Sequence, residues 1–152
     1  MDTVIVKANE KIKIGLLIPL TGKNSEIGDS IIKSVRLAIN RIDNPLIEII
    51  PKDTRSNPET TLEVAKELAN SGIKIIIGPV YNENLIYLNK LNEITFLALT
   101  NKNNNFSKNI ISAGINATSQ LNAINKFIKS NKIKKTIFLT PDMSFKNEIK
   151  KA

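Results

Sequence analysis

The sequence of 152 residues contains no cysteine and no histidine. Their absence excludes Ser-His-Asp and Cys-His catalysis, disulfides, and metal sites built on thiolate or imidazole ligands. Most enzyme classes therefore lack their usual catalytic groups in this chain. We expect a protein that is not an enzyme and that holds no cofactor and no metal ion.

Long apolar runs are also absent. No segment approaches the ~18 consecutive apolar residues that a membrane-spanning helix needs, and the densest apolar runs have the length of strands. The first eight residues lack a basic stretch followed by a long apolar run, so they do not form a signal peptide. We expect no membrane insertion of this chain and expect any leader peptide to have been removed.

Acidic and aromatic residues are few. The chain has 14 Asp+Glu against 22 Lys+Arg, a net charge of +8, and its aromatic content is 5% with no tryptophan. Only three of the basic residues are arginines, whereas nucleic-acid binders favour arginine and stacking aromatics. Lysine, isoleucine and asparagine are abundant together, which an AT-rich coding sequence also produces. We therefore expect no nucleic-acid partner.

The chain does contain an alternation of apolar, strand-length runs with segments of helical periodicity. The apolar runs predict strands over residues 12–20, 47–53, 73–79, 94–99, 109–113 and 136–139. Helical spacing predicts helices over residues 31–42, 58–70, 82–90 and 118–128, with a further helix starting over residues 141–149. This alternation predicts an α/β fold with a parallel sheet flanked by helices. Because the last helix stops at Ala152, we expect the chain to be truncated.

Polar residues before the helical segments predict where the helices begin. Asp29 or Ser30 can cap the first helix, and Thr118 can cap the helix that follows the fifth strand. Asn57 followed by Pro58 predicts the N-cap and the first helical position of the second helix. A proline near the end of the second strand predicts that this strand lies at an edge of the sheet.

The usual nucleotide-binding motifs are missing. Gly22-Lys23 is followed by Asn24 in place of Ser or Thr, and the upstream glycine of a P-loop is absent. No G-x-G-x-x-G follows a predicted strand, so a dinucleotide fold is unsupported. The polar loop over residues 21–25 could bind a flavin phosphate with its backbone N–H groups. The later loops, however, lack the aromatic side chains that stack on a flavin.

A set of polar residues follows the predicted strands at one edge of the sheet, because the carboxyl ends of parallel strands share an edge. The set comprises Thr21 and Ser25, then Asp53, Thr54 and Arg55, then Tyr81 and Asn82, and finally Thr100 and Asn101. Hydroxyls, an amide and the N-terminus of the helix starting near Asn82 could hold a small zwitterion there. The alternative is that they are ordinary loop and cap residues.

The ordered motifs resemble the first lobe of the type I periplasmic binding proteins, the leucine/isoleucine/valine-binding family. The matching segments are residues 12–22, Gly28, residues 52–54, Asn57-Pro58 and residues 71–79. The resemblance implies a Rossmann-like first lobe over residues 12–115, preceded by an N-terminal extension over residues 1–11. It further implies that residues 116–152 begin a second, incomplete lobe, and that the loops after the first, third and fourth strands hold an amino acid.

Three segments resemble a divergent branch of the same fold, the penicillin-binding-protein activator lipoproteins. The segments are Leu17-Ile18-Pro19-Leu20-Thr21-Gly22, Ile77-Gly78-Pro79 and Leu97-Ala98-Leu99-Thr100-Asn101. Where amino-acid binders usually carry small hydroxyl residues after the third strand, this chain has Tyr81-Asn82-Glu83-Asn84. This branch implies a protein partner in the cell envelope, a peptidoglycan synthase that the protein regulates, and not a transported solute.

The resemblance leaves two functions open. The first is a lobe that closes with a second lobe around an amino acid or similar small polar solute and delivers it to the permease of an ABC transporter. The predicted ligand contacts are Asn82, Thr100 and Asn101, followed by Thr21, Ser25 and Tyr81. The alternative is an activator-like protein that binds and regulates a peptidoglycan synthase. Both functions imply the periplasm or cell envelope, and both leave a dimer possible.

Overall fold

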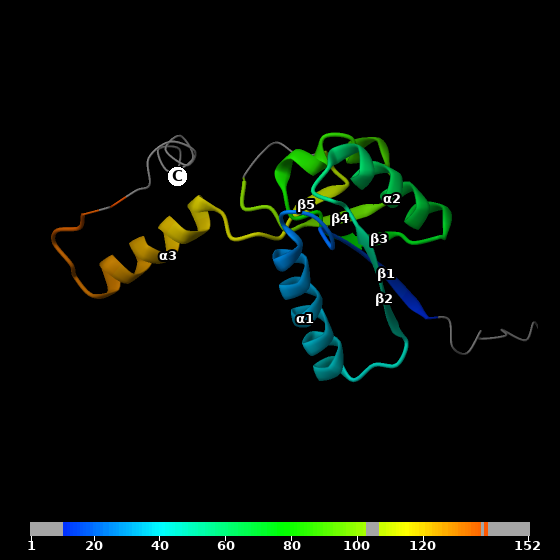
Figure 1. Cartoon of the computed structure of the whole chain (residues 1–152). Coiled ribbons are helices and arrows are strands. Elements are labelled where there is room, and N and C mark those ends of the chain that lie inside the picture. The colour runs from blue at the N-terminus through cyan, green and yellow to red at the C-terminus, as the bar shows by residue number, and fades with distance from the viewer. Residues whose placement is uncertain (1–10, 103–106, 138, 140–152) are drawn as a thin grey trace, which may run out of the picture.

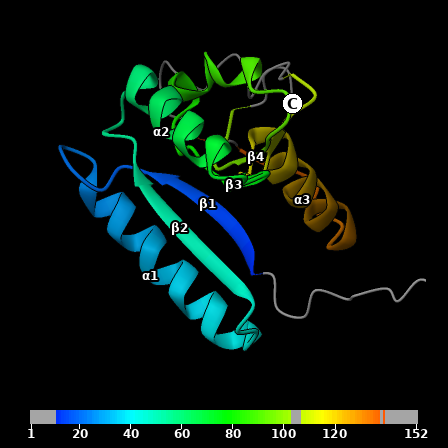
Figure 2. The same cartoon turned by 90° about the vertical axis from the view of Figure 1, so that its right-hand side faces the viewer.

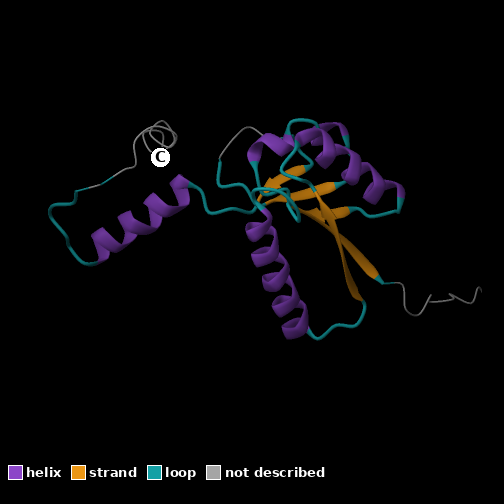
Figure 3. Ribbon diagram, in the orientation of Figure 1, coloured by secondary structure: helices purple, strands orange, loops and turns teal. Residues whose placement is uncertain are grey.

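The computed structural model describes residues 11–102, 107–137 and 139. Five parallel strands form one sheet in the order β2-β1-β3-β4-β5. The strands are β1 (Ile12–Ile18), β2 (Ile47–Asp53), β3 (Ile75–Ile77), β4 (Thr95–Ala98) and β5 (Ile110–Ser112). The helices are α1 (Ser25–Ile42), α2 (Pro58–Asn70) and α3 (Ala117–Ser130), with two 3₁₀ helices, η1 (Asn82–Leu85) and η2 (Leu88–Lys90). The predicted α/β class with a parallel sheet is confirmed (Figures 1 and 3).

Helices cover the two faces of the sheet unequally. Figure 2 shows α2 and the 3₁₀ helices over one face, and α1 beside β1 and β2 on the other. The buried core lies on the α2 face, where Leu17, Ile76 and Phe96 of the sheet meet Leu68 of α2. On α1, only Gly28 is buried. Most of the apolar burial that stabilises the fold therefore comes from one face.

The edge position of β2 is confirmed. Among the described residues β2 pairs only with β1, from Ile12↔Ile47 to Ile18↔Asp53. Pro51 lies within β2 and has no N–H to donate, so an edge strand is where the ladder tolerates it. β3 lies in the middle of the sheet, between β1 and β4.

Several predicted elements differ in the structure. β1 ends at Ile18, two residues before the predicted end, and β3 comprises only Ile75–Ile77. The predicted helix over residues 82–90 is wrong, because so short a segment forms too few hydrogen bonds to offset helix nucleation, and two 3₁₀ turns form instead. The predicted strand over residues 136–139 is absent from its described residues, which pair with no other strand. Phe138 and residues 141–149 lie outside the described residues.

Asparagine side chains cap two of the described helices. Asn57 caps α2 as predicted, since its Oδ1 accepts a hydrogen bond from the Thr60 N–H at 2.9 Å, and a proline follows at the first helical position. The predicted cap of the helix after the fifth strand, Thr118, is wrong. Asn116 caps α3 instead, with its Oδ1 accepting a hydrogen bond from the Ser119 N–H at 2.9 Å. Side-chain oxygens at both positions satisfy a backbone N–H that the helix leaves unpaired.

α1 begins at Ser25, about one turn before the predicted caps Asp29 and Ser30, which are therefore wrong. No side chain caps the helix. Its start is fixed by packing, because Gly28 lies against the end of β1, where any side chain would collide with the carbonyl oxygen of Pro19. The first turn of α1 is thus packed against the residue that follows β1, a contact that local sequence patterns do not show.

α3 stands away from the sheet (Figure 1). The helix has the predicted apolar positions, but none of its residues is buried, and Ile124 and Phe127 are exposed. Residues 113–116 connect it to β5. α3 therefore adds nothing to the core between the sheet and α2.

We expect Gly28→Ala to lower the free energy of unfolding by about 1–3 kcal/mol, because the new Cβ forces α1 away from Pro19. The sign of this stability change is informative, because replacing glycine by alanine in a solvent-exposed helix raises the free energy of unfolding by up to about 1 kcal/mol. Urea unfolding followed by circular dichroism measures the effect. Ser34→Ala, at an exposed position of α1, is the control and should change stability by less than about 0.5 kcal/mol. A raised stability of Gly28→Ala would contradict the contact.

Candidate functional site

The carboxyl ends of the parallel strands meet at one edge of the sheet, and we call this edge the rim. It comprises residues 19–25 after β1, 53–57 at the end of β2, 78–82 after β3 and 99–102 after β4. β2 lies on one side of β1, whereas β3, β4 and β5 lie on the other. The direction of the strand order therefore reverses between β1 and β3, and open α/β sheets bind their ligands at such a point.

Asp53, the last residue of β2, ties the first two rim loops together. Its Oδ1 accepts hydrogen bonds from the backbone N–H groups of Leu20 at 2.8 Å, Thr21 at 3.4 Å and Arg55 at 2.9 Å. The Thr21 hydroxyl donates to Oδ2 at 2.6 Å, and the Arg55 Nε lies 3.9 Å from the same oxygen. The predicted ligand contact Thr21 thus uses its hydroxyl proton to hold two loops together.

The pKa of Asp53 reflects two opposing effects. Burial disfavours the charged form and raises the pKa, but four hydrogen bonds favour the charged form. The bond from the Thr21 hydroxyl and those from the backbone of Arg55, Leu20 and Thr21 outweigh burial, so the pKa of Asp53 lies below its ordinary value. The carboxylate is therefore a charged, fixed acceptor at neutral pH.

The loop after β2 is held by further hydrogen bonds. Thr54 is buried, its N–H donates to the Ile18 carbonyl at 2.9 Å, and its hydroxyl accepts from the Ser56 N–H at 3.3 Å. The Asn24 amide donates to the Ser56 hydroxyl at 2.9 Å. Arg55 and Ser56 have φ angles of 50° and 54°, a left-handed conformation that costs energy in residues other than glycine. These contacts maintain the strained loop.

The loop after β3 positions Tyr81 and Asn82, which are half-buried where η1 begins. In place of the predicted helix, η1 is a 3₁₀ helix of four residues that begins at Asn82. So short a helix sums few peptide dipoles at its N-terminus. Gly78, with a φ of 101°, leads into this loop. Its N–H donates to the Leu97 carbonyl at 2.8 Å, and a side chain there would collide with the Leu17 carbonyl.

Asn84 is a buried polar residue outside the predicted set of site residues. Its exposed fraction is 1%, and neither its Nδ2 nor its Oδ1 has a hydrogen-bond partner in the part of the chain that the structure describes. Leaving a buried polar group unpaired costs about 1–3 kcal/mol. Nothing in the sequence distinguishes Asn84 from the exposed asparagines of this chain, because its burial depends on the packing of η1.

The two predicted residues after β4 differ in exposure. Thr100 is 3% exposed, and its hydroxyl accepts a hydrogen bond from the Lys102 N–H at 3.2 Å. The Thr100 carbonyl accepts from the Ser112 hydroxyl at 3.1 Å and lies so close to Gly114 that a side chain there would collide with it. Asn101 is exposed. Thr100 therefore anchors the chain as it leaves β5, whereas Asn101 is open to contact.

The structure brings the predicted site residues to the rim but does not join them into one cluster of side chains. Ser25 is the first residue of α1, and its N–H donates to the Gly22 carbonyl at 3.2 Å. No hydrogen bond connects the side chains of Thr21, Tyr81 and Thr100 within the described residues. Ligand binding by these residues stays a prediction.

Metal binding and membrane insertion were both expected to be absent. Within residues 11–102, 107–137 and 139, no three acidic side chains gather in an arrangement that could hold a metal ion. None of the helices described is both long enough and apolar enough to cross a bilayer.

An α/β sheet with a reversal of strand order and a hydrogen-bonded rim defines a class of binding lobes. A family model described as periplasmic binding protein matches residues 11–152. The chain therefore belongs to the periplasmic binding protein family, whose members are typically not catalysts. The resemblance found in the motifs is confirmed at the level of the family.

Solved structures of similar fold fall into two groups. Full-length LpoA from Haemophilus influenzae matches with a TM-score of 0.75 at 20% identity, over 93% of this chain and 26% of that one. The LpoA C-domain from the same organism, described as a regulator of PBP1A, matches with a TM-score of 0.68 at 21% identity, over 80% of this chain and 38% of that one. The leucine binding protein LivK from Thermotoga maritima matches with a TM-score of 0.63 at 20% identity, over 80% of this chain and 37% of that one. The chain spans only 26–38% of these three structures, which share its fold. No curated protein sequence matches it.

We expect Asp53→Asn to lower the free energy of unfolding at neutral pH by about 1.5–3 kcal/mol, the range for hydrogen bonds to a charged group. Because the folded-state pKa lies below the unfolded value, the stabilisation is present above the unfolded pKa and is lost as the pH falls through the folded one. The difference between wild type and variant should therefore shrink below about pH 4.

Urea unfolding between about pH 7 and pH 3 measures this difference. Asp29→Asn, which removes an exposed carboxylate of α1, is the matched control and should show no comparable dependence. A stability difference for Asp53→Asn that stays constant down to the lowest pH would contradict the role of the charge.

We expect Asn84→Leu to raise the free energy of unfolding by about 1–2 kcal/mol, because it replaces an unpaired buried amide with an apolar group of similar size. Thermal and urea unfolding measure the change. Asn70→Leu, at the exposed end of α2, should leave stability within about 0.5 kcal/mol. A clear loss of stability in Asn84→Leu would mean that the amide is hydrogen-bonded in solution.

Proposed function

We propose that this chain is a lobe of a cell-envelope protein that binds a protein partner at the rim and regulates a peptidoglycan synthase. The likeness to LpoA supports the proposal, with a TM-score of 0.75 over 93% of the chain against 0.63 over 80% for LivK. The resemblance of residues 77–79 and 97–101 to the activator lipoproteins points the same way. Membership of the periplasmic binding protein family implies the periplasm or cell envelope.

The observation that carries the proposal is that polar side chains of the rim form hydrogen bonds with other groups of the rim. The Thr21 hydroxyl donates to Asp53, the Asn24 amide donates to Ser56, and the buried Thr100 hydroxyl accepts a backbone N–H. A site for a small polar solute needs convergent polar groups that the ligand can engage. Here these groups hold the loops in place, which favours a preformed surface for a protein.

Exposed rim side chains offer the contacts for such a partner. Lys23, Arg55 and Asn101 are exposed, and two of the three are cationic. Complementary charge speeds association and excludes wrong partners. We therefore assign the docking surface to these three residues and expect an acidic patch on the synthase.

The same proposal divides the chain into lobes. We place the first lobe over residues 12–115, after an N-terminal extension over residues 1–11, and the start of a second lobe over residues 116–152. Two observations support the division. α3 buries none of its residues, and the chain leaves β5 through Gly114, which passes close to the Thr100 carbonyl.

A biosensor carrying the purified peptidoglycan synthase of the same organism tests the proposal with the full chain in solution. We expect saturable binding that Lys23→Glu weakens at least about tenfold, equivalent to 1.4 kcal/mol. Lys66→Glu, an equal charge reversal at an exposed position of α2, is the control and should leave the affinity unchanged. Absence of saturable binding, or equal losses in the two variants, would refute the docking surface.

Solute binding is the second candidate function, because the leucine binding protein LivK also shares the fold. The chain would then close with a second lobe around an amino acid and deliver it to an ABC permease. Amide NMR during titration with a panel of amino acids at about tens of millimolar decides between the two, since half a site binds at about millimolar strength. We expect no saturable shifts. Shifts confined to the amides of Thr21, Asn82, Thr100 and Asn101 would replace the regulator proposal with solute binding.

A further inference from the structure

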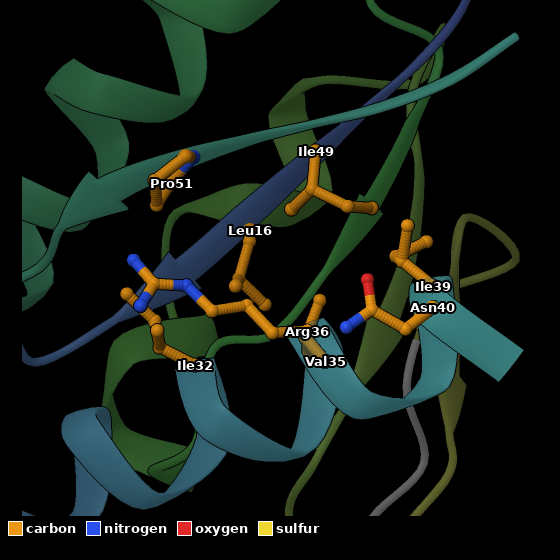
Figure 4. A pocket seen from close by; sticks show the side chains of 8 residues that line it. All are labelled: Leu16, Ile32, Val35, Arg36, Ile39, Asn40, Ile49 and Pro51. Atoms are coloured by element: carbon orange, nitrogen blue, oxygen red, sulfur yellow. The ribbon is translucent and has the colours of Figure 1, made fainter. Parts of the chain in front are cut away.

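A groove separates α1 from the two strands it covers. The groove has a volume of about 260 Å³, and Leu16 of β1 and Ile49 of β2 form its floor. Ile32 and Val35 of α1 form the opposite wall (Figure 4). The helix is held tightly to the sheet only at Gly28, near its start, and buries no other residue. The remaining length of α1 therefore leaves space above the strands.

Two polar side chains of α1 reach this groove, Arg36 and Asn40, one helical turn apart. Figure 4 shows the Arg36 side chain extending along the groove toward Pro51, with the Asn40 amide at the other end beside Ile39. Within the described residues, Arg36 forms no ion pair and no side-chain hydrogen bond. Arg36 is exposed, so a guanidinium with five donors borders an apolar surface and is open to an anionic ligand.

Among the described residues, no carboxylate forms an ion pair with Arg36. The acidic residues nearest to it in the sequence, Asp29 of α1 and Asp43 just after the helix, are each seven positions away, nearly two helical turns. The strands contribute only apolar side chains to the groove. Asp53, at the end of β2, is engaged by the N–H groups of the rim. The charge and the lining together complement a molecule with an anionic head and an aliphatic body.

We propose that this groove binds a small aliphatic carboxylate, such as a branched or medium-chain fatty acid. The carboxylate pairs with the Arg36 guanidinium at one end of the groove, while the aliphatic chain lies on Leu16 and Ile49 and extends toward Asn40. The volume of about 260 Å³ lies just below the ~300–1,000 Å³ of pockets for drug-sized ligands, which limits the occupant to one short chain. The site lies on the α1 face and is independent of partner binding at the rim.

Methyl NMR of the full chain during titration with octanoate tests the proposal. We expect saturable shifts of the Ile32, Ile39 and Ile49 methyl signals, which lie around the groove. 1-Octanol has the same chain length without the charge and should bind at least about tenfold more weakly, since the charged pair is absent. Equal binding of the two compounds, or no saturable shift with octanoate, would overturn the proposal.

Two substitutions on the same helix separate the role of Arg36 from general charge. Arg36→Gln should weaken octanoate binding at least about tenfold, whereas Arg41→Gln, which removes an exposed charge of α1 outside the groove, should leave it unchanged. Arg36 makes no contact on which folding depends, so both variants should unfold at the wild-type urea concentration. Equal losses in the two variants would overturn the assignment. Shifts of the same methyl signals on raising the protein concentration without octanoate would also overturn it, because a second copy would then fill the groove.

Discussion

The carboxylate of Asp53 is the interaction on which the rim depends. Its oxygens accept hydrogen bonds from the N–H groups of Leu20, Thr21 and Arg55 and from the Thr21 hydroxyl, so one side chain closes two loops. Among the described strands β2 has a single neighbour, β1, and Asp53 adds a connection between the loops that follow these two strands. Because the acceptor is charged, these bonds are stronger than neutral hydrogen bonds. Their effect on the pKa of Asp53 outweighs the opposite effect of burial. The rim therefore consists of stabilised loops.

The uneven covering of the sheet explains why two separate surfaces exist on so small a lobe. The core between the sheet and α2 provides the stability, with Leu17, Ile76 and Phe96 fully buried there. The other face contributes less buried apolar surface. There α1 packs closely at Gly28 and buries none of its other residues. The docking proposed at the rim and the binding proposed in the groove of α1 use different residues, so the two proposals are independent of each other.

Sequence patterns predicted what depends on neighbouring residues and failed where distant residues decide. The order of strands and helices, the edge position of β2 and the Asn57 cap all follow from spacing, proline chemistry and local hydrogen bonding. The start of α1 was predicted from Asp29 and Ser30, but the contact of Gly28 with the end of β1 moved it about one turn earlier. The helix over residues 82–90 was predicted from apolar spacing, which does not include the cost of nucleating so short a segment.

By itself the sequence determined the α/β class, the position of polar loops at one edge of the sheet, and the absence of histidine and cysteine chemistry, because composition and periodicity are local properties. Only the tertiary structure decided which polar groups are already bonded. Thr21 and Asp53 are 32 positions apart, and their hydrogen bond exists because β1 and β2 pair in parallel register. The burial of Asn84 and the position of Arg36 beside the groove likewise follow from how helices pack on the sheet. Such contacts join residues that only the folded chain brings together.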